Sequence, residues 1–343
     1  MSSRIPRSLR AALRGGLLVL VVSSAACTTA GGQAGPAAPI PAPSTVRPQY
    51  VALAQAVVAQ HATAWVETDL LAAWVKGPSR YEAVLATVIQ LADRPGVAGV
   101  KIADELGYDD GTDPATALAF LKATTAALHA RLPGRKVLID VIVPQLGCLG
   151  WQRDTVPSVS TECAAREVSK NPATSLAAVD SYVAQGGLDV IDLSPGLRSS
   201  AEYAAWGTTR DEAMAAVWDE ATRRWGGTVR LQARKALAHP GRYDGTAADA
   251  AADVHTFVDI PLAHGAKAVD IWAWSQPYKG GTYTITDPGL RTNPLVEALR
   301  ARRARGAQLW THMTPSSLQV GLEADVASMR TMFGTVFVAS GTG

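Results

Sequence analysis

The chain has 343 residues, 48% of them apolar, which is enough to bury one large hydrophobic core or two modest ones. Its 32 basic and 30 acidic residues nearly cancel, so the composition gives no reason to expect a nucleic acid as partner. Aromatic residues make up only 6% of the chain, yet nine residues are Trp, which forms stacking surfaces as well as cores.

The N-terminus has the pattern of an export signal. An apolar run, Leu17 to Val22, follows a basic stretch and is too short to span a membrane as a stable helix. The basic residues of that stretch are Arg4, Arg7, Arg10 and Arg14. We therefore predict a lipoprotein-type signal peptide over residues 1–26.

The segment that follows, Ser23-Ser24-Ala25-Ala26-Cys27, resembles the lipobox of bacterial lipoproteins, in which cleavage before a cysteine is coupled to lipid attachment. Ser24 stands where the family usually has Leu, so ordinary cleavage after Ala26 stays open as an alternative. The resemblance implies a lipid on Cys27 and a protein held at the outer face of the cell membrane. Residues 27–47 are rich in Gly, Ala and Pro without periodicity, which predicts a flexible tether.

Six later stretches alternate polar and apolar residues, which is the pattern of β-strands whose two faces differ. In chain order they are Thr63 to Asp69, Gly99 to Glu105, Val137 to Val143, Leu188 to Ser194, Val229 to Lys235 and Ala268 to Gln276. Two weaker stretches, Ala307 to Met313 and Thr335 to Ala339, would bring the number of strands to eight.

One face of the six strands is apolar and mostly β-branched, whereas the other is polar. The polar face takes Trp65, Glu67, Asp69, Lys101, Glu105, Asp140, Asp192, Gln232, Arg234, Asp270, Trp272 and Trp274. Burying so many polar groups without partners would be costly, so we expect this face to converge on water or on a ligand.

Two cysteines, Cys148 and Cys163, lie in one loop-like stretch after the third strand. In an exported protein they favour a disulfide, the alternative being two unpaired buried thiols. No spacing of His and Cys matches a zinc site, so no metal is expected.

Helices are predicted between the strands. Three have a start signal in which Asp or Asn precedes a proline, namely Asp113-Pro114, Asn171-Pro172 and Asn293-Pro294. Others are expected near residues 79–93, 209–225 and 246–264, the last with a break near Pro261. The basic run from Arg300 to Arg305 is expected to lie at the C-terminal end of a helix rather than to bind nucleic acid.

The order strand, helix, strand, helix, with no hairpin signal between neighbours, predicts βαβ units and a parallel sheet. An open doubly wound sheet is one alternative, but helices cover both its faces and its strands are continuous apolar runs. The polar face favours a lumen instead. We predict a single α/β domain over residues 48–343, a (β/α)8 TIM-type barrel whose functional residues lie at the C-terminal ends of the strands.

Several enzyme classes lack their motif in this sequence. It has no Gly-rich strand-to-helix turn of the dinucleotide or P-loop type and no G-x-S-x-G elbow, and no cofactor is expected. The six His are scattered, and none is assigned a role: His61, His129, His239, His255, His264 and His312.

What remains is a set of carboxylates beside tryptophans. Glycoside hydrolysis needs one carboxyl group as general acid and another as base or nucleophile. The stretch from Asp270 to Gln276 holds an acid and two Trp, and Tyr278 and a Gly-Gly loop follow it. Here the chain resembles the barrel glycoside hydrolases, in which a Trp near the end of a late strand commonly floors the sugar subsite. The familiar Asn-Glu at the fourth strand end is replaced by Asp192-Leu193-Ser194-Pro195.

The candidate catalytic carboxylates are Glu105, Asp192 and Asp140, with Glu105 and Asp192 as the best acid–base pair. Candidate substrate-binding residues are Glu67, Asp69, Lys101, Gln232, Arg234, Asp270, Trp272 and Trp274. Of the two Trp, Trp274 is nearer the mouth and is the better sugar platform. Structural alternatives are a Lys101–Glu105 ion pair within the lumen and a deep Asp140–Arg234 pair.

Two classes of function are consistent with the sequence. The first is an exported, lipid-anchored, glycoside-hydrolase-like protein that acts on or binds a polysaccharide of the cell envelope or the environment. The second is a solute-binding lipoprotein of a transporter. The alternating acids and Arg favour the first, since a two-lobed receptor would hold its ligand mostly on inter-lobe loops. A barrel that binds glycan without catalysis is a third possibility.

The lipid anchor can be tested directly. Replacing Cys27 with Ala removes the only acceptor for the lipid, so the variant should leave the membrane fraction and enter the medium. Immunoblots of both fractions measure this. A variant that stays bound to the membrane contradicts the lipobox.

Overall fold

We describe the fold from a computed structural model in which residues 46–152 and 158–342 are described. The predicted signal peptide, Cys27 and nearly all of the predicted tether lie outside these ranges. Within them, no helix has the length and apolar character needed to cross a membrane.

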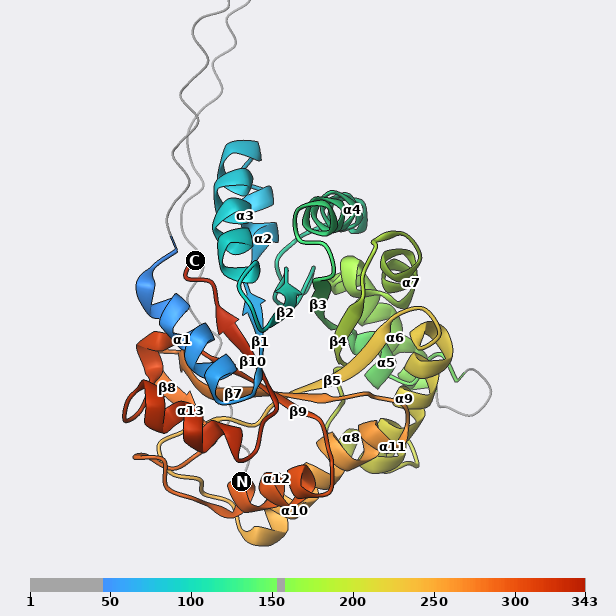
Figure 1. The fold of residues 1–343 in the computed structure, drawn as a ribbon. Helices are drawn as coiled ribbons and strands as arrows, with labels where there is room; N and C mark the ends of the chain where they lie inside the picture. Colours follow the sequence, from blue (N-terminus) through green and yellow to red (C-terminus); the bar gives the residue numbers. More distant parts are fainter. Residues whose placement is uncertain (1–45, 153–157, 343) are drawn as a thin grey trace, which may run out of the picture. The chain divides into compact units, whose positions relative to one another are not determined.

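Eight parallel strands close into a ring (Figure 1). They are β1 (Thr63–Glu67), β2 (Val97–Lys101), β3 (Lys136–Ile142), β4 (Val190–Ser194), β5 (Arg230–Ala236), β7 (Val269–Tyr278), β9 (Leu309–Met313) and β10 (Thr335–Ala339). Each strand pairs in parallel with the next, and β10 pairs back with β1. The predicted (β/α)8 barrel is confirmed, and the open sheet is excluded.

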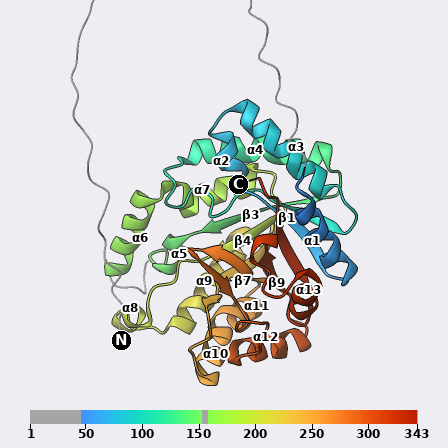
Figure 2. The same ribbon diagram turned by 90° about the vertical axis from the view of Figure 1, so that its left-hand side faces the viewer.

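Helices cover the outside of the ring (Figure 2). The main ones are α1 (Pro48–Ala59), α3 (Pro78–Ala92), α4 (Pro114–Arg131), α6 (Ser158–Lys170), α7 (Leu176–Gln185), α9 (Arg210–Trp225), α10 (Ala247–Val254), α12 (Pro294–Ala304) and α13 (Leu322–Arg330). Short helices are α2 (Leu70–Trp74), α5 (Pro144–Gly147), α8 (Ser200–Ala205), α11 (Ile260–Ala263), the 3-10 turns η1 (Pro172–Thr174) and η3 (Pro315–Ser317), and the π-helix η2 (His255–Asp259).

The two faces of the strands separate as the alternation predicted. The β-branched face packs against the helices and belongs to the main core, as Val66, Val100 and Ile139 do. The other face fills the lumen. Its apolar floor, toward the N-terminal ends of the strands, consists of Trp65, Leu138, Val190, Ala268, Trp310 and Phe337. Polar residues of the same parity therefore form the next layer toward the C-terminal ends.

One hairpin interrupts the βα order. Strand β7 runs past the barrel and turns back into β8 (Gly281–Thr284), which also pairs with the short β6 (His239–Pro240). The turn residues Lys279 and Gly280 have φ of 48° and 78°, as a type I′ turn requires. This hairpin adds a strand outside the ring, and the eight barrel strands themselves pair in parallel, as their order in the sequence predicted.

The predicted helix starts are confirmed at two of three positions. The Asp113 side chain accepts hydrogen bonds from the backbone N–H groups of Ala115 and Thr116, and Asn293 accepts one from Val296. The prediction of Asn171 as a helix cap is wrong, because its side chain accepts a hydrogen bond from the backbone N–H of Asp109 instead. Ser175 caps α7 in its place.

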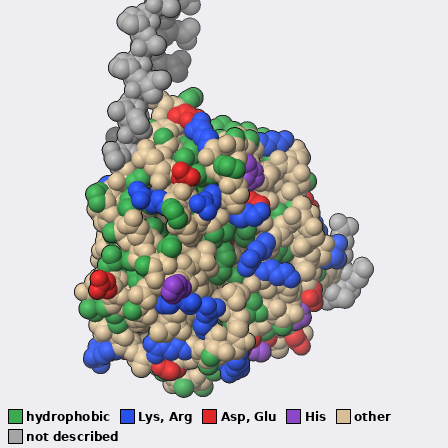
Figure 3. All heavy atoms as spheres, viewed as in Figure 1, with side chains coloured by type: hydrophobic (Ala, Val, Ile, Leu, Met, Phe, Trp, Pro, Cys, Tyr) green, Lys and Arg blue, Asp and Glu red, His purple; other side chains and the backbone are tan. Residues whose placement is uncertain are grey.

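Basic side chains gather in the last turns of α4, α9, α12 and α13, where they face the negative end of each helix dipole. Arg302 and Arg303 confirm the predicted place of the basic run at a helix end. On the face of the molecule in Figure 3, Lys and Arg side chains are far more frequent than acidic ones.

The predicted disulfide is confirmed. Cys148 and Cys163 are bonded, with their Cα atoms 5.6 Å apart, and they join the end of α5 to α6. Beside the bond, the buried Ser160 hydroxyl donates to the carbonyl of Cys148 at 2.6 Å. The end of α5 and the first turns of α6 are thus joined by a covalent and a hydrogen bond.

Replacing both cysteines by Ala should lower the free energy of unfolding by about 3 kcal/mol, because the cross-link closes a loop of 15 residues in the unfolded chain. Urea denaturation of the double variant and of the oxidised protein gives the difference. Equal midpoints would contradict a stabilising role for the bond.

Candidate active site

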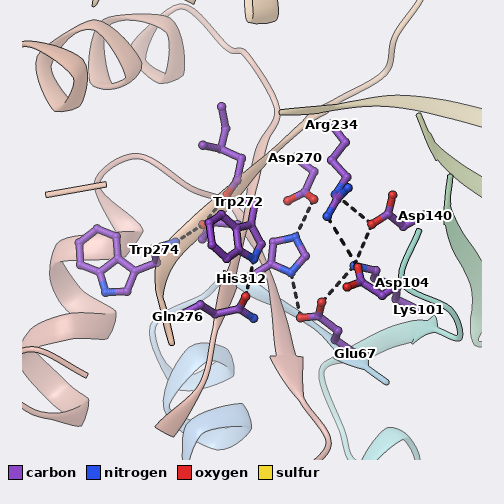
Figure 4. Close-up of polar contacts among 12 residues, drawn as sticks. Glu67, Lys101, Asp104, Asp140, Arg234, Asp270, Trp272, Trp274, Gln276 and His312 are labelled. Atoms are coloured by element: carbon purple, nitrogen blue, oxygen red, sulfur yellow. Dashed lines mark hydrogen bonds and ion pairs between the residues drawn. The ribbon is translucent and has the colours of Figure 1, made fainter. Parts of the chain in front are cut away.

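Six charged side chains of alternating sign run around the lumen (Figure 4). Each comes from a different strand, and together we call them the charge ring: Asp270 (β7), His312 (β9), Glu67 (β1), Lys101 (β2), Asp140 (β3) and Arg234 (β5). Five of them show no more than 12% exposure of the side chain, and Glu67 shows 14%. Such a layer is stable only if each charge has a partner of opposite sign.

His312 joins two carboxylates across three strands. Its Nδ1 lies 2.8 Å from Glu67 Oε2, and its Nε2 lies 2.6 Å from Asp270 Oδ2. Because carboxylate oxygens only accept, both ring nitrogens must donate, and the imidazole is a cation. Burial alone would lower its pKa, but the charges of Asp270 and Glu67 outweigh burial and raise the pKa of His312 to about 9.

Lys101 is the next cation of the ring. Its ammonium lies 3.0 Å from Glu67, 3.3 Å from Asp140 and 2.9 Å from Asp104. Burial opposes its charge, yet the three carboxylates together hold the pKa of Lys101 well above its ordinary value. The positive charges of His312 and Lys101 in turn overcome the effect of burial on Glu67 and lower its pKa.

Arg234 connects the ring to the mouth of the barrel. Its guanidinium lies 2.9 Å from the buried Asp140, 2.9 Å from Glu105 and 3.7 Å from Asp104. The predicted Asp140–Arg234 pair is therefore present. The alternative Lys101–Glu105 pair is wrong, because the chain leaves β2 at Lys101 and strand parity no longer applies beyond it. Asp104 turns to Lys101 instead, and Glu105, with φ of 48°, turns to Arg234.

Asp104 and Asp140 form an unequal carboxyl pair. The positive charge of Lys101 is the largest influence on Asp104, whose pKa lies far below its usual range. Burial is the largest influence on Asp140 and raises its pKa to about 7, against the pull of Arg234 and Lys101. Opposite shifts in neighbouring carboxyl groups are typical of acid–base sites. The side chain of Asp104 is 54% exposed, whereas that of Asp140 is fully buried.

Asp192 lies in the gap of the ring on β4. It stands in register with Asp140 and Gln232, and all three side chains are fully buried. Burial, followed by the negative charges of Asp270 and Asp140, raises the pKa of Asp192 well above its ordinary value. A side-chain hydrogen bond with Asp270 acts in the same direction, whereas the amide atoms of Gln232 have no hydrogen-bond partner among the described residues. Asp192 is thus a fully buried acid whose surroundings favour its protonated form.

A cavity of about 540 Å³ opens beside the ends of β1 and β2. Its wall includes Asp104 and Glu105, together with Asp69 and Tyr108. The predicted site residue Asp69 is the N-cap of α2, where its side chain accepts from the backbone of Ala72. Asp104 and Glu105 are thus acids of the cavity wall that also contact the charge ring, and with 54% and 40% of their side chains exposed, solvent and a ligand can reach both.

Three aromatic side chains stand at the end of β7 and on its hairpin. The rings of Trp272, Tyr278 and Tyr283 lie 5.2–6.0 Å apart, and Tyr278 is 43% exposed. Trp272 is half-buried, and its indole N–H donates to the side chain of Gln276. Trp272 follows Asp270 at the same parity, so it lies one layer above the charge ring.

Trp274 does not point into the lumen. The register between β7 and β9 shifts after Ile271, which turns Trp274 away from the charge ring (Figure 4). It is fully buried, and its indole N–H donates to Asp325 at 3.1 Å. Trp272, rather than Trp274, is accordingly the tryptophan at the mouth, because the irregularity in β7 reverses the parity on which the expectation rested.

Two members of the site were missed in the sequence, Asp104 and His312. The signal for His312 was present, since His312 and Trp310 lie two residues apart on β9 and therefore share the lumen face of that strand. Strand parity selected Glu105 over Asp104, but β2 ends at Lys101 and both acids lie beyond it. In the described part of the chain, no group of His, Cys, Asp and Glu side chains is arranged to hold a metal ion.

Comparison with known proteins finds only distant likenesses among solved structures. No family model and no curated protein sequence matches this chain. A β-glucosidase is 11% identical over 76% of this chain and 77% of its own, with a TM-score of 0.40. The dihydropteroate synthase of Coxiella burnetii is 11% identical over 82% of this chain and 88% of its own, with a TM-score of 0.41. The dihydrodipicolinate synthase of Rhodopseudomonas palustris is 13% identical over 81% of this chain and 70% of its own, with a TM-score of 0.40. With TM-scores of 0.41 or less, these likenesses support no conclusion about this chain.

His312 gives the protein a pH-dependent stability. Its pKa rises from 6.5 to about 9 on folding, so the stabilisation is complete below about 6.5 and is lost as the pH rises through about 9. His312→Gln should lower the free energy of unfolding by about 3–5 kcal/mol at neutral pH, and the difference should shrink above pH ~9.

Urea denaturation across this pH range measures the effect. The matched control is His129→Gln, since His129 pairs with Asp189 at 3.2 Å on the surface and should change stability by less than about 1 kcal/mol. An equal, pH-independent loss in both variants would contradict the role of His312.

Proposed function

We propose that the protein is an exported, lipid-anchored enzyme of the glycoside-hydrolase type, which acts on a polysaccharide of the cell envelope or the environment. The observation that carries the proposal is the pair of reachable carboxylates, Asp104 and Glu105, which the charge ring holds at the edge of a cavity. The N-terminal signal and Cys27 support the location.

The proposed chemistry uses two carboxyl groups. Asp104 stays ionised beside Lys101 and is suited to act as base or nucleophile. Glu105, held by Arg234, is the second carboxyl group that can reach a glycosidic oxygen. Asp140 and Asp192, which the sequence suggested as catalytic, are buried completely. We assign them the role of positioning residues, whose raised pKa values reduce the negative charge next to Asp104 and Asp270.

The aromatic cluster supports a sugar as ligand. Trp272 and Tyr278 offer apolar ring surface at the mouth, and stacking of aromatic rings on the apolar faces of a ligand needs such a surface. The other candidate substrate-binding residues divide into two groups. Glu67, Lys101, Arg234 and Asp270 belong to the charge ring, whereas Gln232 lies deeper beside Asp192.

A transporter receptor is less well supported. The polar faces of the strands line one lumen, whereas the receptor alternative expects ligand contacts between two lobes. A glycan-binding barrel without catalysis has one observation in its favour, because most carboxylates of the site are already neutralised by Lys101, Arg234 or His312. Binding of glycans without any cleavage would favour that alternative.

The test compares Asp104→Asn and Glu105→Gln with Asp110→Asn, a matched carboxylate of the same cavity that contacts neither Lys101 nor Arg234. On a panel of bacterial and plant polysaccharides, the first two variants should lose about 100-fold or more in kcat, since each removes an acid–base group. Asp110→Asn should keep its activity. Full turnover by both variants on a glycan that the protein cleaves contradicts the assignment.

A further inference from the structure

A second cluster of charges lies on the outside of the barrel, beside β5. The Lys235 ammonium stands 4.2 Å from the centre of the Phe257 ring, and the Arg210 guanidinium carbon stands 4.7 Å from the same centre. Lys235 alternates with Arg234 on β5, so it points out of the lumen. Arg210 is the first residue of α9, and Phe257 belongs to the π-helix η2, which packs against both β5 and α9.

Neither cation has a carboxylate partner. Among the residues that the structure describes, no hydrogen bond or ion pair is formed by the side chain of Lys235 or Arg210, and the Nε of Arg210 is buried without a partner. Two like charges on one aromatic ring repel each other, and cation–π attraction offsets that repulsion only in part. An anion bound between Lys235 and Arg210 would reduce this repulsion and so stabilise the pair.

The surrounding acids do not supply that anion. Burial and the positive charge of Arg210 lower the pKa of Lys235, and they outweigh the opposite effect of Asp253. The carboxylate of Asp211 already accepts from the Thr256 hydroxyl at 2.5 Å and lies 3.8 Å from His255. The cluster therefore keeps an excess of positive charge.

Arg210 also borders an open space. A cavity of about 360 Å³ lies between α8, the start of α9 and α10, and Arg210 is part of its wall. Hydroxyl groups of Ser200, Thr208, Thr209 and Thr256 line the same cavity, beside Asp211 and Asp253. The hydroxyls of Thr208 and Thr209 already donate to Glu212, and that of Thr256 donates to Asp211. The donor that suits the oxygens of a tetrahedral anion is therefore the guanidinium of Arg210. The π-helix adds a further indication, since such turns occur frequently at functional sites.

We propose that Arg210 and Lys235, held together on Phe257, form a binding site for a tetrahedral oxyanion, namely a phosphate or sulfate group. The site lies outside the lumen and is independent of the proposed acid–base pair. The anion bridges the two cations and approaches Arg210 from the cavity.

The experiment follows the acetylation of Lys235 by acetic anhydride, read by peptide mass spectrometry. Only the neutral amine reacts, and a bound anion favours the ammonium form. Inorganic phosphate should slow the acetylation of Lys235 about tenfold, which corresponds to one pKa unit. Sodium chloride at the same ionic strength should have little effect. Lys267, an exposed lysine that precedes β7, is the internal control.

Two variants complete the test. Arg210→Gln should abolish the protection of Lys235 by phosphate, whereas Arg242→Gln, an exposed arginine outside the cluster, should preserve it. Sodium sulfate and methyl phosphate separate a general tetrahedral site from one that needs a phosphate. Equal slowing by chloride, or protection that survives Arg210→Gln, would overturn the proposal. The measurement on the unaltered protein stands even if the variant does not fold.

Discussion

The structure depends on the alternation of sign around the barrel lumen. Six buried or nearly buried charges from six strands succeed one another as anion and cation, and each anion lies within 3.3 Å of a cation. Removal of a buried partner leaves an uncompensated charge, which costs more than any single surface ion pair contributes. The strands must therefore keep a common register, since a slip by one residue would turn these groups into the helix-facing core.

The lumen contains three cations, Lys101, Arg234 and His312, but more than three acids. Because the cations are too few, the acids near the mouth differ in pKa. Asp104 and Asp140 both approach Lys101 and Arg234, and burial raises the pKa of Asp140 to about 7 while the pKa of the more exposed Asp104 stays far below its usual range. Burial and the negative charges of Asp270 and Asp140 outweigh the charge of Arg234 at Asp192 and raise the pKa of this carboxyl group well above its ordinary value. Burial and charge together thus distinguish carboxylates that are alike in the sequence.

The expected lumen was predictable because side chains in a strand alternate strictly. That rule placed Glu67, Lys101, Asp140 and Asp270 correctly in one layer. It failed where the strand ends or becomes irregular. Trp274 left the lumen at a register shift, and Glu105 was exchanged for Asp104 beyond the last residue of β2.

The sequence by itself determined the eight-stranded barrel, the polar lumen and the cysteine pair, because periodicity and spacing are local properties of the chain. Only the tertiary structure decided the partners. His312 could have been placed inside by parity, yet its contact with Glu67 arises from the closure of the ring across β9, β10 and β1. The protonation of each acid follows from distances between strands that are far apart in the chain, and no local pattern records those distances.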